Sequence, residues 1–346
     1  MPLRFARCRT VSSDCSNAQA HPLELLSDAW HPDSHQVRKM TKQELSIGLI
    51  GCGLMGSGIA ASLLRNGYSV SILEHEGNQP LERLINAGAA TAGSIATLAR
   101  QSELLILCVT GTPQVEAVFF HDDGLLKHLR PGTTIIDCST AIPASTQRIA
   151  QAVQAAGGRF LDAAMTRTPK EAAEGRLNLI VGGEKQDFDA CLPVLRAYAE
   201  EIVHAGPVGA GHQMKLLHNY VSLGFSAVLA EAAALARRCG ADPALFCQVL
   251  AAGGGGGVVL ERLRPFIEQG DPGNFRFSTA NALKDLEYYC ALAEQQQGRS
   301  QVAQAVRALY ADATAAGLGQ QPVPQVIDHL SGQSTTEPGS ISGTKG

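Results

Sequence analysis

The sequence predicts an α/β protein in which a doubly wound, mainly parallel sheet is followed by an all-α domain. Short apolar runs alternate with helical stretches from Leu45 to His204, which is typical of strand–helix–strand units. After Gly206-Pro207 the strand-like runs stop and only helical patterns follow. We therefore predict a sheet domain over residues 44–204 and a helical domain over residues 205–330.

The candidate strands are short and almost continuously apolar, as expected of strands that are covered on both faces of a parallel sheet. They are residues 46–50, 69–73, 104–109, 133–137, 159–163 and 177–181. Amphipathic stretches between them, such as residues 57–65, 80–87 and 143–156, predict the covering helices.

The second half predicts helices at residues 211–238, 242–250, 258–268, 278–294 and 300–315. Asp242-Pro243 is a good helix start, because aspartate caps the first turn and proline fits its first position. The glycine run at residues 253–257 predicts a loop that serves as a plain connection, with a flexible lid as the alternative.

The two ends of the chain have a different composition. Residues 1–43 show no sustained period and predict a disordered extension; a transit peptide, or a natural start at Met40, are the alternatives. Residues 331–346 are rich in Ser, Gly and Thr and predict a disordered tail.

Composition argues against several classes of function. The net charge of −4 disfavours nucleic acid or an anionic membrane as partner, and the lack of a run of eighteen apolar residues disfavours a membrane span. The nine cysteines lack CxxC spacing, and no HxxxH spacing or carboxylate cluster accompanies His204, His212 and His218. Such cysteines predict thiols in a reducing compartment, so we expect a cytoplasmic protein without a metal.

A glycine-rich turn directly after the first strand predicts a dinucleotide site. Gly51, Gly53 and Gly56 form the pattern GxGxxG. The first glycine allows the tight turn, the second lets the backbone approach a diphosphate, and the third lets the helix pack on the strand. Leu54 and Met55 open that helix, whose N-terminal amides are donors for the diphosphate. The sheet is therefore predicted to be of the Rossmann type.

The ends of three strands predict further contacts, with NAD as the cofactor. The second strand ends at Glu74, whose carboxylate would bind ribose hydroxyls and repel a 2′-phosphate. Doubly wound sheets bind ligands at the carboxyl ends of their strands. Val109 and Thr110 are therefore predicted to border the nicotinamide. Ser139 and Thr140 are predicted to contact the substrate or the nicotinamide, with a role as turn formers or caps as the alternative.

Lys215 and Asn219 predict a proton-transfer site. They lie four residues apart after a glycine-rich turn, so a helix places the amine and the amide on one face. Met214, Leu216 and Leu217 surround the lysine with apolar groups, which favour a lysine that loses its proton easily.

Together these motifs resemble the β-hydroxyacid dehydrogenase family, which includes 3-hydroxyisobutyrate dehydrogenases and tartronate semialdehyde reductases. The resemblance spans residues 46 to about 320 and rests on residues 48–56, 137–140, 209–219 and 284–286. It implies hydride transfer between NAD and a small hydroxy acid or its aldehyde, with Lys215 as the general acid and base. It also implies Asn219 as a substrate contact, Lys284 closing on the cofactor or the substrate, and a homodimer or homotetramer.

One motif differs from the common family pattern. Where family members usually carry Ser-Gly-Gly, this chain has Thr166-Arg167-Thr168, which is similar to sulfolactaldehyde reductases and 4-hydroxybutyrate dehydrogenases. Arginine offers a rigid fork of donors for a carboxylate or sulfonate. We expect Arg167, with Thr168, to bind the substrate anion; the alternative is that Arg167 faces solvent or pairs with Glu171 or Glu174.

Other functions stay open at this point. A 3-hydroxyisobutyrate or tartronate semialdehyde type of dehydrogenase is the first alternative. An imine reductase would share the two-domain form, although Lys215 favours carbonyl chemistry. A non-catalytic NAD-binding regulator would keep the three glycines and lose Lys215 and Asn219, which are both present.

Overall fold

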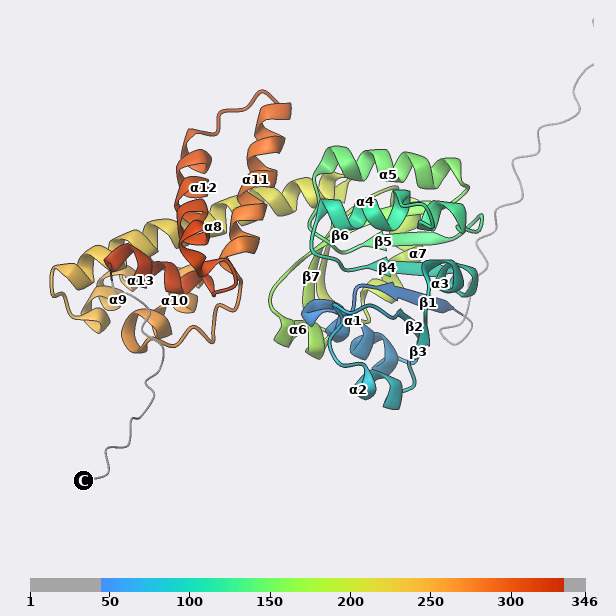
Figure 1. Ribbon diagram of the computed structural model, residues 1–346, viewed down its shortest axis with the longest axis horizontal. Helices are drawn as coiled ribbons and strands as arrows, with labels where there is room; N and C mark the ends of the chain where they lie inside the picture. Colours follow the sequence, from blue (N-terminus) through green and yellow to red (C-terminus); the bar gives the residue numbers. More distant parts are fainter. Residues whose placement is uncertain (1–44, 333–346) are drawn as a thin grey trace, which may run out of the picture. The chain divides into compact units, whose positions relative to one another are not determined.

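The computed structural model describes residues 45–332, whose strands form an eight-stranded sheet (Figure 1). The strands are β1 Ser46–Ile50, β2 Ser69–Leu73, β3 Ala90–Ala92, β4 Leu104–Leu107, β5 Thr134–Asp137, β6 Arg159–Thr166, β7 Leu177–Gly182 and β8 Ala199–Gly206. They lie in the order β3-β2-β1-β4-β5-β6-β7-β8, and all neighbours are parallel except β6 and β7. The prediction for residues 1–43, and that for residues 333–346 of the tail predicted over 331–346, lie outside the described residues; Ser331 of that tail is instead the last residue of a helix, Val326–Ser331.

The two strands at the edges of this sheet, β3 and β8, were not predicted. β3 has only three residues, and β8 begins with Ala199 followed by the exposed Glu200 and Glu201. An edge strand pairs on one side only and tolerates polar residues. Neither edge therefore has the apolar run by which the interior strands were recognised.

Helices cover both faces of the sheet, as a doubly wound fold requires. They are α1 Leu54–Arg65, α2 Glu82–Asn86, α3 Ile95–Gln101, α4 Thr112–Phe120, α5 Pro143–Ala155, α6 Pro169–Glu174 and α7 Lys185–Leu195. Ile106 and Leu107 are successive residues of β4 and point to opposite faces. Ile106 shares a buried cluster with Ile59 of α1, and Leu107 shares another with Phe119 of α4.

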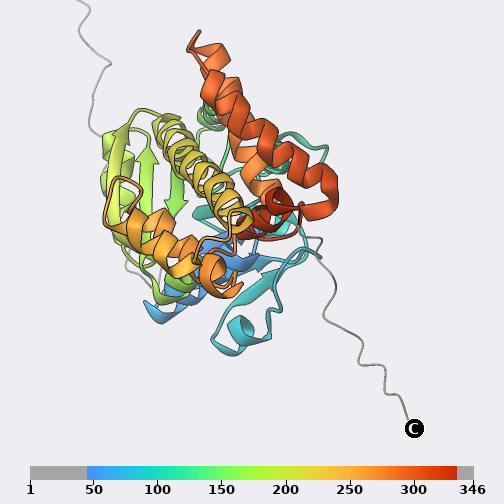
Figure 2. The same cartoon turned by 90° about the vertical axis from the view of Figure 1, so that its left-hand side faces the viewer.

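The long helix α8, Ala210–Arg238, begins the all-helical part of the chain (Figure 2). The helices that follow are α9 Pro243–Ala251, α10 Val258–Gln269, α11 Thr279–Gln295, α12 Gln301–Ala313 and α13 Val326–Ser331. Shorter helical turns are Leu125–Lys127, Thr314–Leu318 and Val323–Gln325. Ala227, Ala230 and Ala234 are buried on α8, and their small side chains let Leu263 of α10 and Tyr310 of α12 pack closely.

The change from strands to helices lies between Gly206 and Ala210. The α/β class with a helical second part is confirmed. Residues on the two sides of that change belong to one compact unit, so the division into two domains near residue 205 stays a prediction. Among the described helices, α8 has the length and apolar composition to cross a membrane, which the core helix of a soluble protein also has. The predicted absence of a membrane span therefore stays a prediction.

Candidate active site

The turn after β1 fits the diphosphate of a dinucleotide. Gly51 has φ = +91°, which favours glycine, and a Cβ there would lie 2.4 Å from the Cys108 carbonyl oxygen. A Cβ on Gly56 would lie 2.0 Å from the Gly51 carbonyl oxygen, whereas a Cβ on Gly53 would meet no atom within 4 Å. The first and third glycines thus allow close packing, and the second leaves room for a diphosphate to approach the backbone.

The other predicted cofactor contacts gather at the same edge of the sheet. β1 and β4 are neighbours at the point where the strand order reverses, where doubly wound sheets bind ligands. Leu54 and Met55 form the first turn of α1 after β1, and Val109 and Thr110 follow β4. The fold therefore brings these residues from two loops to one place.

Glu74 follows β2 with an exposed side chain, and its N–H donates to the Ala92 carbonyl at 2.9 Å. Asn78, which the sequence reasoning missed, ties this region to the glycine turn. Its side chain accepts from the Cys52 N–H at 3.0 Å and donates to the Leu73 carbonyl at 2.9 Å. An asparagine in a loop is an ordinary turn former and gave no signal of this link.

Ser139 joins the ends of β4 and β5. It is buried, and its hydroxyl oxygen accepts a hydrogen bond from the Val109 N–H at 3.0 Å. Its own N–H donates to the Asp137 carboxylate at 2.9 Å. Thr140 beside it is partly exposed. The substrate contacts predicted for Ser139 and Thr140 stay predictions.

Lys215 lies near the start of α8 and is partly buried. Burial lowers the pKa of its amine to about 8, Asp285 opposes this shift, and Lys284 and Arg262 lower the pKa further. A group that titrates near the working pH is suited to proton transfer. The amine can therefore both give and take a proton near neutral pH.

Polar contacts beside Lys215 join α8 to α11. The Asn219 amide donates to the Asp285 carboxylate at 2.6 Å, and both residues are buried. The other Asp285 oxygen lies 3.3 Å from the Lys284 amine, which also donates to the Thr110 carbonyl. Asn219, Lys284 and Thr110 are thus brought together. Asp285 links them, and its one signal in the sequence was its place after Lys284.

Asp162 of β6 holds the start of α8. It is fully buried, and its carboxylate accepts hydrogen bonds from the Gly209 and His212 N–H groups at 2.7 and 2.8 Å. The first amides of a helix lack partners within it, and a carboxylate suits the positive end of the helix dipole. Asp162 thereby fixes the helix turn that precedes Lys215. Sequence reasoning assigned it no role, because it lies 47 residues before Gly209.

Arg167 has φ = +79°, in the left-handed region that residues other than glycine rarely adopt. Strain of this kind is often found at functional sites. Its guanidinium donates to the Arg176 carbonyl at 2.6 Å and to the Glu200 carboxylate, and the hydrogen bond lowers the pKa of Glu200. Its ion-pair partner is thus Glu200 of β8 rather than Glu171 or Glu174.

Thr168 begins α6. Its hydroxyl oxygen accepts from the Lys170 N–H at 3.3 Å, and its N–H donates to the Glu171 carboxylate at 3.0 Å. These contacts form a capping box, which satisfies amides at the helix start. The substrate contact predicted for Thr168 stays a prediction.

Arg262 of α10 is a cation that the sequence reasoning missed. It is partly buried, and its guanidinium lies 5.9 Å from the centre of the Phe275 ring. After burial, its charge is among the causes that lower the pKa of Lys215 and of His218. Within residues 45–332, no carboxylate forms an ion pair with it. An arginine in a stretch of charged helix residues gave no signal of this position.

The histidines near α8 are used in local contacts. His212 Nδ1 lies 2.7 Å from the Thr146 hydroxyl, and His218 Nδ1 lies 3.0 Å from the Asn219 side-chain oxygen. His204 Nε2 lies 2.8 Å from the Gly183 carbonyl. In the part of the chain that the structure describes, no three His, Cys, Asp or Glu side chains are grouped to hold a metal ion.

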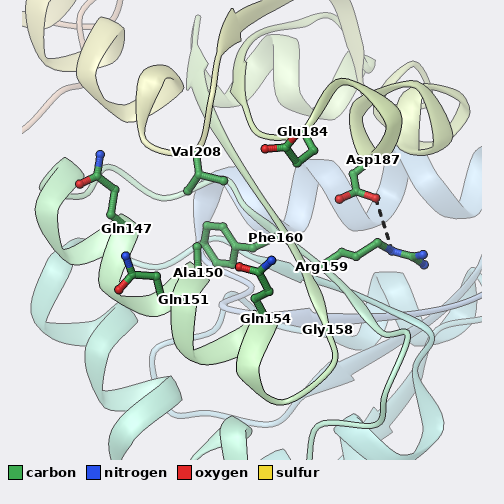
Figure 3. A pocket seen from close by; sticks show the side chains of 10 residues that line it. All are labelled: Gln147, Ala150, Gln151, Gln154, Gly158, Arg159, Phe160, Glu184, Asp187 and Val208. Atoms are coloured by element: carbon green, nitrogen blue, oxygen red, sulfur yellow. Dashed lines mark ion pairs between the residues drawn. The ribbon is translucent and has the colours of Figure 1, made fainter. Parts of the chain in front are cut away.

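A cavity of about 260 Å³ opens between α5, the start of β6 and α7 (Figure 3). Gln147, Gln151 and Gln154 of α5 line it, together with Arg159 and Asp187, whose charged groups are 3.6 Å apart. No predicted site residue lines this cavity, so it is separate from the candidate active site.

Two family models match the chain. Residues 46–206 match the NAD binding domain of 6-phosphogluconate dehydrogenase, and residues 209–330 match the NAD-binding domain of NADP-dependent 3-hydroxyisobutyrate dehydrogenase. With the glycine cradle at the reversal of strand order, these matches define an oxidoreductase that depends on a nicotinamide dinucleotide.

Individual proteins agree with this class. A 3-hydroxyisobutyrate dehydrogenase of Pseudomonas aeruginosa is 32% identical over 272 residues, covering 76% of this chain and 90% of that protein. A 3-sulfolactaldehyde reductase of Escherichia coli is 29% identical over 286 residues, covering 82% and 95%. The crystal structure of 3-hydroxyisobutyrate dehydrogenase from Salmonella typhimurium is 28% identical with a TM-score of 0.74, covering 82% and 99%. The chain belongs to the β-hydroxyacid dehydrogenase family, which confirms the predicted family and enzyme class.

Proposed function

We propose that the protein interconverts a small anionic 3-hydroxy acid, or an ω-hydroxy acid, and its aldehyde, with NAD as the cofactor. The observation that carries this proposal is the Lys215 amine, whose pKa burial lowers to about 8 beside the Asn219–Asp285 pair. When bound, NAD supplies or accepts the hydride. Lys215 gives a proton to the carbonyl oxygen in reduction and takes one from the hydroxyl in oxidation.

Asn219 follows Lys215 by one helical turn and is proposed to orient the substrate. The 2.6 Å bond to Asp285 fixes the rotation of its amide. A fixed amide orders a substrate without first losing its own rotational freedom. Ser139 and Thr140, at the carboxyl end of β5, are proposed as the other polar contacts.

Arg167 is proposed to bind the anionic group of the substrate, which would replace the Glu200 carboxylate as the ion-pair partner of the guanidinium. The ion pair that must open is partly exposed, and such pairs are worth only about 0–1 kcal/mol. The likeness to 3-sulfolactaldehyde reductase supports an anionic aldehyde. Arg262 is the second candidate, because it has no ion-pair partner among the described residues and lies within electrostatic reach of Lys215.

NAD is proposed over NADP because of Glu74. Its exposed carboxylate at the end of β2 would repel the 2′-phosphate of NADP, and no Lys or Arg follows before Arg83. A higher kcat/KM with NADH than with NADPH is the expected result.

The alternatives differ in substrate or in catalysis. A 3-hydroxyisobutyrate or tartronate semialdehyde type is supported by the relative that is 32% identical. An imine reductase and a non-catalytic regulator are disfavoured by the presence of Lys215 and Asn219. A homodimer or homotetramer in the cytoplasm is also proposed.

The test compares kcat/KM for NADH-dependent reduction of sulfolactaldehyde, succinate semialdehyde and methylmalonate semialdehyde. All three aldehydes are anions, so the comparison separates substrate types: a preference for sulfolactaldehyde or succinate semialdehyde supports the branch of the family that has an arginine in the substrate loop. A preference for methylmalonate semialdehyde instead indicates the 3-hydroxyisobutyrate type. NADH binding without turnover of any aldehyde would favour the regulator.

A further inference from the structure

Tyr288 of α11 reaches the loop that follows β4. It is buried, and its phenolic oxygen accepts a hydrogen bond from the Thr112 N–H at 2.9 Å. Thr112 begins α4, so its amide has no acceptor within its own helix. Tyr288 therefore supplies the acceptor from a position 176 residues further along the chain.

The ring of Tyr288 packs in a small apolar cluster. It clusters with Leu216 of α8 and Leu292 of α11, and Ile142 before α5 packs against them. The Ile142 N–H donates to the Thr112 hydroxyl oxygen at 2.9 Å. The tyrosine thus lies where α8, α11 and the loops after β4 and β5 come together.

Lys284 lies one helical turn before Tyr288 and contacts the same loop. Its amine is 5.5 Å from the centre of the Tyr288 ring, a distance at which the ring face attracts a cation. The same amine donates to the Thr110 carbonyl. The loop is therefore held through Thr110 by Lys284 and through Thr112 by Tyr288.

Gly111 lies between these two contacts and directly against the tyrosine. A Cβ on Gly111 would be 2.5 Å from the Tyr288 oxygen. Its φ of −179° is extended backbone that any residue adopts, so the space and not the backbone requires glycine. The fit between Tyr288 and this loop is accordingly close.

We propose that Tyr288 is a positioning residue of the cofactor site. Its hydroxyl fixes the loop after β4, and its ring fixes the Lys284 amine against that loop. The proposal rests on the proposed function in one respect, namely that this loop and Lys284 contact the dinucleotide. The loop after β4 lies beside the reversal of strand order between β1 and β4, where doubly wound sheets bind ligands, and this location supports that contact.

The test measures the Kd for NADH of the full-length protein by fluorescence titration, with no aldehyde or hydroxy acid present. Tyr288→Phe keeps the ring and removes the acceptor of the Thr112 amide. We expect it to raise the Kd for NADH about tenfold, which corresponds to about 1.4 kcal/mol. The matched control is Tyr289→Phe, since Tyr289 stacks on Tyr220 with ring centres 4.1 Å apart and leaves the loop alone. This control should leave the Kd within about twofold.

A second variant tests the close fit at Gly111. Gly111→Ala should also weaken NADH binding, because its Cβ would displace the Tyr288 oxygen. In a protein that already carries Tyr288→Phe, Gly111→Ala should raise the Kd for NADH by a smaller factor than it does alone, because the oxygen with which its Cβ clashes is gone. Fully additive effects would contradict the proposal.

If Tyr288 only stabilises the fold, the Tyr288→Phe experiment should give a different result. Tyr288→Phe would then lower the midpoint of urea unfolding and leave the Kd for NADH unchanged, which would overturn the proposal. Failure of the parent protein to bind NADH would instead overturn the cofactor assignment. Because no aldehyde enters this titration, a wrong substrate class leaves its outcome unaffected.

Discussion

Lys215 carries the proton in the proposed reaction, and its surroundings set the pH at which it does so. Burial lowers the pKa of its amine to about 8. Reduction uses the protonated amine, so its kcat/KM should fall above about pH 8; oxidation uses the neutral amine and should fall below it. Measurements of kcat/KM in both directions across neutral and alkaline pH check this dependence.

Lys215→Ala should lower kcat by about 10²–10⁴-fold, because positioned proton transfer contributes that much. A Lys215→Ala variant that loses NADH affinity while keeping its turnover would contradict this role.

Substitution of Arg262 provides an independent test of the lowered pKa of the Lys215 amine. The charge of Arg262 lowers the pKa of Lys215, so Arg262→Gln should move the break in the pH profile upward. Arg264→Gln is the matched control on the same helix, since Arg264 pairs with Glu268 at 2.7 Å. A break that stays in place in both variants would show that Arg262 does not act on Lys215.

Arg167 and Arg262 can be separated by their effects on the substrate. Arg167→Ala should raise KM for an anionic aldehyde about tenfold, or about 1.4 kcal/mol, because a charge-assisted hydrogen bond is lost. Arg176→Ala is the control, because Arg176 also lies near Glu200, at 3.5 Å. Equal KM values for Arg167→Ala and the parent, with a higher KM for Arg262→Gln, would assign the anion to Arg262.

The side chains of the site were largely recognisable by type, whereas their partners were not. Lys215 and Asn219 lie one turn apart, so their shared face followed from helical periodicity alone. Asp285 lies 66 residues from Asn219, and Arg167 reaches Glu200 across 33 residues. Such contacts depend on how the elements pack, which no local pattern contains.

Among the elements, interior strands were predictable and edge strands were not. β4 is buried at all four positions, because sheet and helices cover it on every side. β3 and β8 pair with one neighbour each and carry exposed residues. A run of apolar residues indicates a buried strand, so strand prediction from such runs fails for edge strands that are partly exposed to solvent.

The helix α8 depends on its cap for its position. Asp162→Ala would leave the Gly209 and His212 amides without their buried acceptor and should cost about 2 kcal/mol of unfolding free energy. Asp189→Ala is the control, since its pair with Lys185 is exposed and contributes little. Urea unfolding measures both. An Asp162→Ala protein as stable as the control would contradict the capping role.

At the scale of the whole molecule, α8 also carries an exposed apolar stripe. Met214, Val221, Val228 and Leu235 are 48%, 68%, 62% and 62% exposed and recur every seven residues. That spacing places them along one side of the helix. Single exposed apolar residues are ordinary, but several that repeat along one side of a helix are typical of a surface that another subunit covers.

The stripe supports the prediction of a homodimer or homotetramer and makes it testable. Val228 lies within the stripe, so Val228→Glu would place a charge in the covered surface and should weaken self-association by tenfold or more, on the order of 1.4 kcal/mol. Ile85→Glu is the control, because Ile85 is 47% exposed on the short helix α2 in the sheet part of the chain. Light scattering with size-exclusion chromatography measures the mass of each variant. A parent protein that is monomeric, or a Val228→Glu variant with the parent's mass across dilutions, would show that the stripe is not the contact between subunits.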